Sequence, residues 1–241
     1  MLTKIEEQII FENEEIVVVN KPSGMLTIPD REGKDISLKQ LLKNKYGGIF
    51  IVHRLDRETS GIIVFAKNEE THKQLSRQFE NRETKKTYHG LILGKPPRQS
   101  GIINAPIAEH PSRKGMMTVY KKGKESITEY EIIENFRLYT WMKFSILTGR
   151  THQIRVHMKY IGHPIVCDDI YGDGKQVFIS ALKKKFNLSK DQETERPILS
   201  RLALHSSLLQ FEVDSKPYDF EAPLPKDLKA LLQQLRKIHS S

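Results

Sequence analysis

Strand-like segments dominate the middle of this sequence and limit the folds available to it. Three segments rich in β-branched and aromatic residues lie at 88–93, 127–133 and 139–146, separated by clusters of Gly, Pro and Lys. Apolar runs at 16–19 and 61–66 predict two further strands, and 202–213 predicts another. A series of strands with few helices between them is typical of an α+β fold with a largely antiparallel sheet.

Four segments have apolar residues at helical spacing: 37–46, 68–80, 151–161 and about 225–239. Asn68 can cap the second of these, and Gly162 ends the third. The polar residues 172–197 predict a solvated excursion. Because no internal repeat or low-complexity linker divides the chain, we expect a single domain over residues 1–241.

The net charge of the chain indicates which kinds of partner it can bind. The chain has 39 Lys and Arg against 30 Asp and Glu, a net charge of +9, which favours a polyanion such as RNA but also fits an ordinary basic protein. No apolar run approaches the ~18 residues that a membrane span needs. The acidic N-terminal segment differs from a secretory signal, and Cys167 alone forms no internal disulfide. We therefore expect a cytoplasmic protein that does not contact membranes.

The segment 53–61, His-Arg-Leu-Asp-Arg-Glu-Thr-Ser-Gly, places several ionisable side chains directly before an apolar strand. A loop that enters a buried strand is a rigid place for a catalytic carboxylate, which makes Asp56 a candidate. The same pattern also fits a structural turn, in which Asp56 binds backbone amides.

A second segment, 148–157, contains Arg150 after a flexible Gly149 and close to the first turn of the predicted helix. Arg150 could pair with Asp56 and hold it ionised, or could bind a phosphate at the start of the helix. His152 and His157 are five residues apart, which does not suit a helical zinc pair, so we expect no metal site here.

A third segment, 82–90, is a basic stretch that leads into a strand bearing Tyr88. An aromatic ring beside basic residues could stack on an unpaired RNA base, although a tyrosine of the core has the same pattern. The glycine-rich motifs of kinase-like and dinucleotide-binding proteins are missing from the sequence, as is the G-x-S-x-G motif of hydrolases. No acidic cluster has the spacing of a two-metal nuclease site.

Together these segments resemble the RluA family of pseudouridine synthases. Residues 53–61 match the signature around the family's catalytic aspartate, and Lys21-Pro22-Ser23-Gly24 resembles the motif that opens its catalytic domain. Residues 86–88 resemble the segment with the active-site tyrosine, and 149–157 with 162–164 the motif with its basic partner. The matches run from about residue 11 to 222. The sequence departs at Gly90 and Ser206, where the family often has Ala, and begins without the family's frequent N-terminal RNA-binding domain.

The resemblance implies isomerisation of uridine to pseudouridine in ribosomal or transfer RNA, without metal or cofactor. The implied fold is a long, mostly antiparallel mixed sheet with flanking helices and a central active-site cleft. Asp56 would be the catalytic carboxylate, Arg150 its ion-pair partner and Tyr88 the ring against the uracil. Arg54 would fill the gap left by the flipped base, and Leu204 would be part of an apolar wall. His53, Lys86 and Arg155 complete the expected RNA contacts.

We expect a monomer that needs no protein partner. Two alternatives remain at this stage: an RNA-binding module without activity, for which Asp56 would be dispensable, and a metal-dependent nuclease, which a chelator would inactivate.

Overall fold

The structure, a computed structural model, describes residues 5–30, 35–183 and 194–239. Within these residues the helices are η1 (Ile5–Gln8, a 3-10 helix), α1 (Leu38–Tyr46), α2 (Glu69–Glu80), α3 (Gln153–Tyr160), α4 (Ile179–Leu182) and α5 (Lys226–His239). The strands are β1 (Ile9–Glu12), β2 (Ile16–Lys21), β3 (Phe50–Ile51), β4 (Ser60–Ala66), β5 (Lys85–Leu93), β6 (Ser100–Asn104), β7 (Ile107–Glu109), β8 (Met117–Val119), β9 (Ile127–Asn135), β10 (Tyr139–Ile146), β11 (Leu204–Val213) and β12 (Lys216–Glu221).

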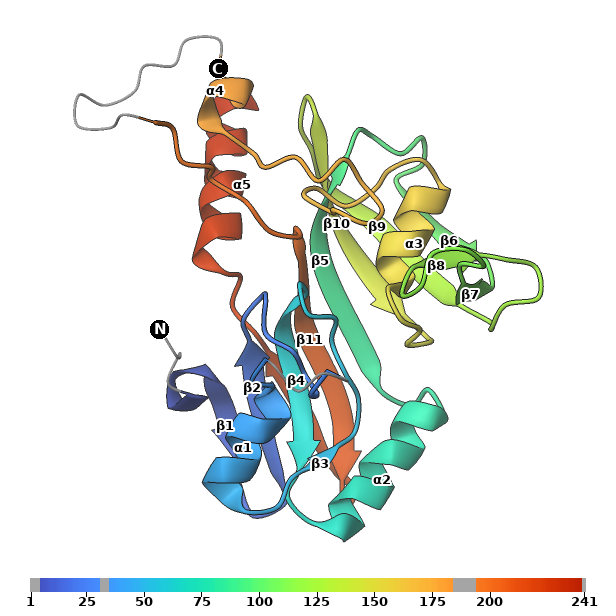
Figure 1. The fold of residues 1–241 in the computed structure, drawn as a ribbon, viewed down its shortest axis with the longest axis vertical. Helices are drawn as coiled ribbons and strands as arrows, with labels where there is room; N and C mark the ends of the chain where they lie inside the picture. Colours follow the sequence, from blue (N-terminus) through green and yellow to red (C-terminus); the bar gives the residue numbers. More distant parts are fainter. Residues whose placement is uncertain (1–4, 31–34, 184–193, 240–241) are drawn as a thin grey trace. The chain divides into compact units, whose positions relative to one another are not determined.

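Ten of these strands form one mixed sheet. Its hydrogen-bonded order is β1-β2-β4-β11-β5-β10-β9-β6, with β12 beside β11 and β3 beside β4 (Figure 1). β4 and β11 are parallel, whereas β2 and β4, β6 and β9, and β11 and β12 are antiparallel. The prediction of an α+β fold with a mostly antiparallel mixed sheet is confirmed.

The chain forms two compact units. Unit 1 consists of residues 1–88, 145–148 and 205–223, and unit 2 consists of residues 89–144, 149–204 and 224–241. Most of the predicted site residues, including Asp56 and Tyr88, belong to unit 1. The prediction of a single domain stays a prediction.

Unit 1 is built on strands that the sequence predicts to be buried. All seven residues of β4 and five of the six in β2 are buried, as expected for β-branched runs enclosed on both faces. Leu75 of α2 packs against these strands, and the Asn68 side chain caps α2 by accepting the backbone N–H of Thr71 at 2.9 Å. The predictions for α1 and α2 are confirmed, including the cap at Asn68, and Ser37 proves to be the N-cap of α1 rather than its first residue.

One helix of unit 2 begins later than predicted. α3 begins at Gln153 rather than Thr151, because His152 has the left-handed backbone conformation (φ 57°), which a helix does not continue through. The amphipathic C-terminal helix is confirmed as α5, which buries Leu228, Leu231, Leu232 and Leu235. Of the predicted excursion 172–197, the described part contains α4 and a bridge from Val177 to Leu199, while 184–193 lies outside the described residues.

In the described ranges, none of the helices combines the length and the apolar character that crossing a bilayer requires.

Candidate active site

Asp56 lies on the loop that enters β4, and its two flanks are held by hydrogen bonds. On one side, Leu55 is buried, and its backbone N–H and C=O both bond to the Thr27 hydroxyl, at 3.2 and 2.8 Å. On the other side, the backbone N–H of Thr59 donates to the Asp56 carbonyl at 3.1 Å, which closes a tight turn. The backbone that carries the carboxylate is therefore fixed.

Lys21, at the end of β2, fixes the same loop from within. Its side chain is fully buried, and its ammonium donates to three carbonyl oxygens: Pro22 at 3.1 Å, Met25 at 2.8 Å and Arg57 at 2.9 Å. The Gly24 N–H also donates to the Arg57 carbonyl, at 2.9 Å. The Lys-Pro-Ser-Gly segment is thus a support for the loop of Asp56.

Ser60 and Gly61, the last two residues of the segment 53–61, determine how closely β4 approaches β11. Gly61 has φ +117°, and a Cβ on it would lie 2.1 Å from the backbone oxygen of Ser206, so only glycine allows the two strands to approach. The Nε2 of buried His205 faces the Ala222 carbonyl at 3.2 Å and must donate to it. The Nδ1 of His205 therefore accepts from the Ser60 hydroxyl at 3.0 Å.

Tyr88 of β5 is buried within unit 1 and lies within the electrostatic influence of Asp56. The side chain is 8% exposed, and its hydroxyl is hydrogen-bonded to the hydroxyl of Ser206. Burial raises the pKa of Tyr88 well above its usual value, the bond from Ser206 lowers it, and the negative charge of Asp56 raises it again. The structure therefore brings a carboxylate and a neutral phenol into electrostatic contact beside a fixed loop.

His53 and Lys86 lie on the two sides of Phe79. The His53 ring stacks on Phe79 with centroids 4.5 Å apart, and the Lys86 ammonium lies 5.4 Å from the Phe79 centroid. Val64 donates its N–H to the Nε2 of His53 at 3.3 Å. Burial, together with the charge of Lys86, lowers the pKa of His53 to about 3. Burial and the neighbouring Arg82 likewise lower the pKa of Lys86.

These contacts give His53 a neutral imidazole that anchors the loop to β4. The predicted contacts of His53 and Lys86 with RNA stay predictions, as does the role of the exposed Arg54 next to Asp56.

The remaining predicted residues belong to unit 2. Arg150 precedes α3 by three residues, and its Nε donates to the Glu125 carbonyl at 3.1 Å. Its predicted ion pair with Asp56, which joins the two units, stays a prediction. Leu204 is 3% exposed at the start of β11. Its Cδ1 would be 3.2 Å from a Cβ on Gly90, which favours glycine there.

Arg155 requires a correction. Its side chain is only 3% exposed and binds the fully buried Asp168 through two hydrogen bonds of 2.7 and 2.8 Å. A guanidinium enclosed in this way holds α3 to the segment around Asp168 and does not present its charge to RNA. We therefore remove Arg155 from the expected RNA contacts.

Comparison with known proteins identifies the family of the chain. The family model described as RNA pseudouridylate synthase matches residues 15–160, which include Asp56, Tyr88 and Arg150. The chain belongs to this family.

Relatives agree with the family, and a solved structure has the same fold. The chain is 32% identical to ribosomal large subunit pseudouridine synthase D of Escherichia coli (strain K12), with 95% of this chain and 70% of that protein covered. The corresponding protein of Nitrosomonas europaea is 36% identical, over 97% of this chain and 67% of the relative. The structure of human RNA pseudouridylate synthase domain containing 4 has a TM-score of 0.75 at 23% identity, covering 96% of this chain and 94% of that one.

The resemblance to the RluA family is thereby confirmed, and the protein is an isomerase that acts on RNA. As a pseudouridine synthase it forms a new bond from C5 of uracil to C1′ of the ribose in place of the bond from N1. The site described above provides groups suited to this: a carboxylate for the sugar and an aromatic ring with a hydroxyl for the base. No cluster of three or more metal-binding side chains occurs in the part of the chain that the structure describes.

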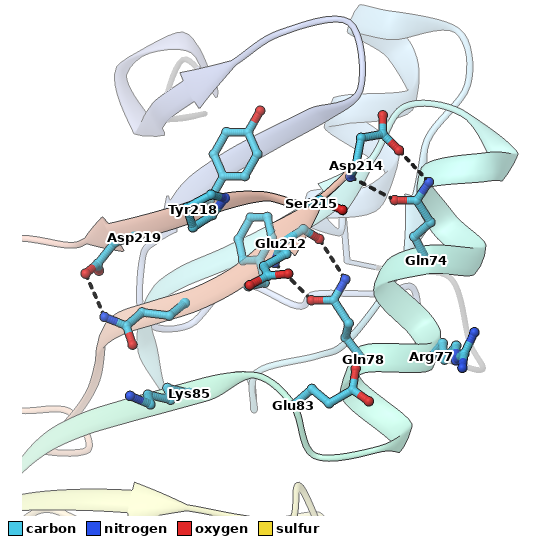
Figure 2. Close-up of a pocket in the computed structure, with 13 residues that line it drawn as sticks. Gln74, Arg77, Gln78, Glu83, Lys85, Glu212, Asp214, Ser215, Tyr218 and Asp219 are labelled. Carbon is cyan, nitrogen blue, oxygen red and sulfur yellow. Dashed lines mark hydrogen bonds between the residues drawn. The ribbon is translucent and has the colours of Figure 1, made fainter.

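A cavity of about 1000 Å³ elsewhere in unit 1 is separate from this site. Figure 2 shows that Gln74 and Gln78 reach from α2 towards β11, where Gln78 bonds to both the N–H and the C=O of Glu212, at 2.9 and 2.7 Å. Four carboxylates and two cationic side chains line the cavity, which does not suit a polyanion. None of the predicted site residues is among the described residues that line it, although Lys85 on β5 is only three residues from Tyr88.

Three supporting residues were missed by the sequence analysis as members of the site: Lys21, Thr27 and Ser206. Lys21 carried a signal, because a lysine that directly follows a buried apolar strand needs several acceptors. Ser206 was noted only as a departure from the family. Thr27 carried no local signal, because its contact with Leu55 depends on how two distant loops pack.

Proposed function

We propose that this pseudouridine synthase modifies uridines in the RNA of the large ribosomal subunit, with Asp56 as its catalytic group. The observation that carries the proposal is the placement of Asp56 beside Tyr88, on a loop held by Lys21 and Thr27. The relatives reported above are named as ribosomal large subunit enzymes, which favours ribosomal over transfer RNA.

The reaction proceeds in three stages. The target uridine leaves its stack at a cost of a few kcal/mol, with Arg54 filling the gap and Leu204 contributing to the apolar wall. Asp56 then acts at the sugar, either by attack on C1′ or by removal of a sugar proton, and the N1–C1′ bond breaks. The uracil turns, C5 bonds to C1′, and the proton on C5 leaves while N1 gains one. The product has the same atoms as the substrate, so no oxidant or nucleotide is consumed.

Two further residues support these steps. The Tyr88 ring lies against the uracil, and its oxygen, in the ionised form, is the base that takes the proton from C5. Arg150 holds Asp56 ionised and oriented through a planar pair of hydrogen bonds. We expect the enzyme to act in the cytoplasm as a monomer, without metal or cofactor.

The test is a map of pseudouridines in total RNA from cells with and without the gene, complemented by wild type or by Asp56→Asn. The proposal expects specific large-subunit ribosomal positions to lose the modification, and only wild type to restore it. If only transfer RNA loses pseudouridines, the substrate is transfer RNA and not ribosomal RNA. Restoration by Asp56→Asn would refute the role of Asp56.

A further inference from the structure

Unit 2 contains a cleft that none of the predicted catalytic residues lines. It has a volume of about 980 Å³, at the upper end of the range for ligand sites. The turn between β9 and β10, the last turn of α5, the end of α4 and Lys95 surround it. α5 is the red helix at the C-terminus in Figure 1.

The rim of the cleft is basic. Lys95, Arg137, Lys183 and Lys237 line it with exposed side chains, and His239 joins them. Among the described residues that line the cleft there is no aspartate or glutamate. Cationic groups concentrated around one opening attract a polyanion.

The floor of the cleft is apolar. Leu138 lies in it with 43% of its surface exposed, beside the buried side chains of Phe136 and Leu235. The Phe136 ring also meets the ring of His239 edge to face, with centroids 6.3 Å apart. An exposed leucine beside aromatic rings offers a surface for the flat face of a base.

The walls of the cleft are held in place. Arg236 of α5 pairs with Glu134 at the end of β9, Nε to Oε2 at 2.8 Å. The Gly94 N–H donates to the Leu138 carbonyl at 2.9 Å, and the Thr140 hydroxyl donates to the Gly94 carbonyl at 2.7 Å. The residues next to Lys95, Leu138 and Lys237 are thus fixed, so less conformational entropy is lost when a ligand binds.

We propose that this cleft is a second RNA-binding site, which takes a single-stranded segment of the substrate RNA. The rim binds the phosphates and the floor receives an unstacked base. The site raises affinity for the RNA without taking part in the chemistry. This inference rests on the proposed function, because RNA is the polyanion that the enzyme must hold.

The test compares two triple variants with equal loss of charge. The cleft variant is Lys95→Gln, Arg137→Gln and Lys183→Gln, and the matched control is Lys114→Gln, Lys121→Gln and Lys122→Gln, exposed residues of the same unit outside the cleft. Affinity for a fluorescent ten-nucleotide oligouridylate is measured at several salt concentrations. We expect the cleft variant to reduce the slope of log K against log salt by about 2, at about 0.7 for each lost phosphate contact. The control should keep the wild-type slope.

Three further measurements sharpen the result. Leu138→Asn should weaken binding of the oligouridylate at every salt concentration without changing the slope, because it alters the floor and not the rim. With ribosomal RNA, the cleft variant should raise KM and leave kcat unchanged. UMP should bind wild type and the cleft variant equally weakly; a large loss of UMP affinity would identify a mononucleotide site instead.

Equal slopes in the cleft and control variants would overturn the proposal, as would an unchanged affinity in Leu138→Asn. These readouts do not require turnover. If the wild-type protein binds the oligouridylate through the cleft but forms no pseudouridine in ribosomal RNA, the proposed function is refuted. The proposal that the cleft binds RNA then still stands.

Discussion

Ser206 hydrogen-bonds the hydroxyl of Tyr88 at a position where the RluA family often has alanine. The Ser206 hydroxyl donates to the Ile62 carbonyl of β4 at 3.2 Å while Tyr88 is neutral, and it can rotate to donate to the oxygen of Tyr88 when the tyrosine ionises. Because its bond lowers the pKa of Tyr88, it favours the ionised form that a base at C5 requires. The departure from the family therefore acts on the reacting side of the site.

Ser206→Ala should slow the single-turnover rate by about 2–10-fold, equivalent to the ~0.5–1.5 kcal/mol of one hydrogen bond. It should also shift to higher pH the limb on which the rate increases with pH, because a base must be ionised to act and the pKa of Tyr88 rises further. Ser207→Ala is the matched control, since Ser207 donates to the Thr87 carbonyl at 3.1 Å instead. Identical profiles for the two variants would show that Ser206 does not act on Tyr88.

His53 links stability to pH. Its pKa is about 3 in the folded state and near 6.5 in the unfolded state, so the unfolded chain gains a proton that the folded chain does not bind. Stability should therefore fall as pH decreases below about 6.5, by up to ~1.4 kcal/mol per pH unit. His53→Gln, which keeps an acceptor for Val64, should lessen this fall between pH 6.5 and 5 in urea unfolding. An equal slope in both proteins would mean that His53 is protonated in the fold.

At the scale of elements, the sequence predicted best where the signal is local. The strands β2 and β4 and the helices α1, α2 and α5 follow from apolar spacing and, for α2, from the cap at Asn68. The start of α3 was misplaced, because the left-handed conformation of His152 has no marker in the sequence. β12 was missed, because its mostly exposed residues are held by pairing with β11 rather than by their own propensity.

The same distinction applies to the candidate site. The motif at 53–61 indicated Asp56, but the contacts that fix it come from Thr27 and Lys21, and such packing depends on the whole fold. Burial could not be read from the sequence either. Arg155 is a basic residue of the kind that contacts RNA, but its side chain is buried against Asp168.

The contact between β4 and β11 should depend on Gly61. Gly61→Ala combines a strained φ, costing ~1–3 kcal/mol, with a clash against the Ser206 backbone, so we expect a loss of roughly 4 kcal/mol or more. Gly47→Ala is the control: its φ is +77°, but nothing lies within 4 Å of the new Cβ, so the loss should be about 1–2 kcal/mol. Urea unfolding of both variants tests the difference. Equal losses would show that β4 and β11 can separate at little cost.

At the scale of the whole molecule, the residues proposed as catalytic belong to both units: Asp56 and Tyr88 to unit 1, Arg150 to unit 2. The proposed ion pair therefore makes activity depend on both units. Arg150→Ala should reduce the single-turnover rate far more than RNA affinity, and Arg150→Lys should restore little, because lysine lacks the planar fork. The exposed Arg98→Ala is the control. A loss of affinity alone in Arg150→Ala would assign Arg150 to a phosphate.

The central claim is that Asp56 performs the chemistry on a uridine of ribosomal RNA. The most direct measurement is the single-turnover rate of pseudouridine formation in large-subunit ribosomal RNA, with RNA affinity measured in parallel, for wild type and Asp56→Asn. We predict no detectable product from Asp56→Asn at nearly unchanged affinity, because affinity comes mostly from phosphate contacts. A residual rate above about a tenth of wild type, a barrier change of less than ~1.4 kcal/mol, would contradict the claim.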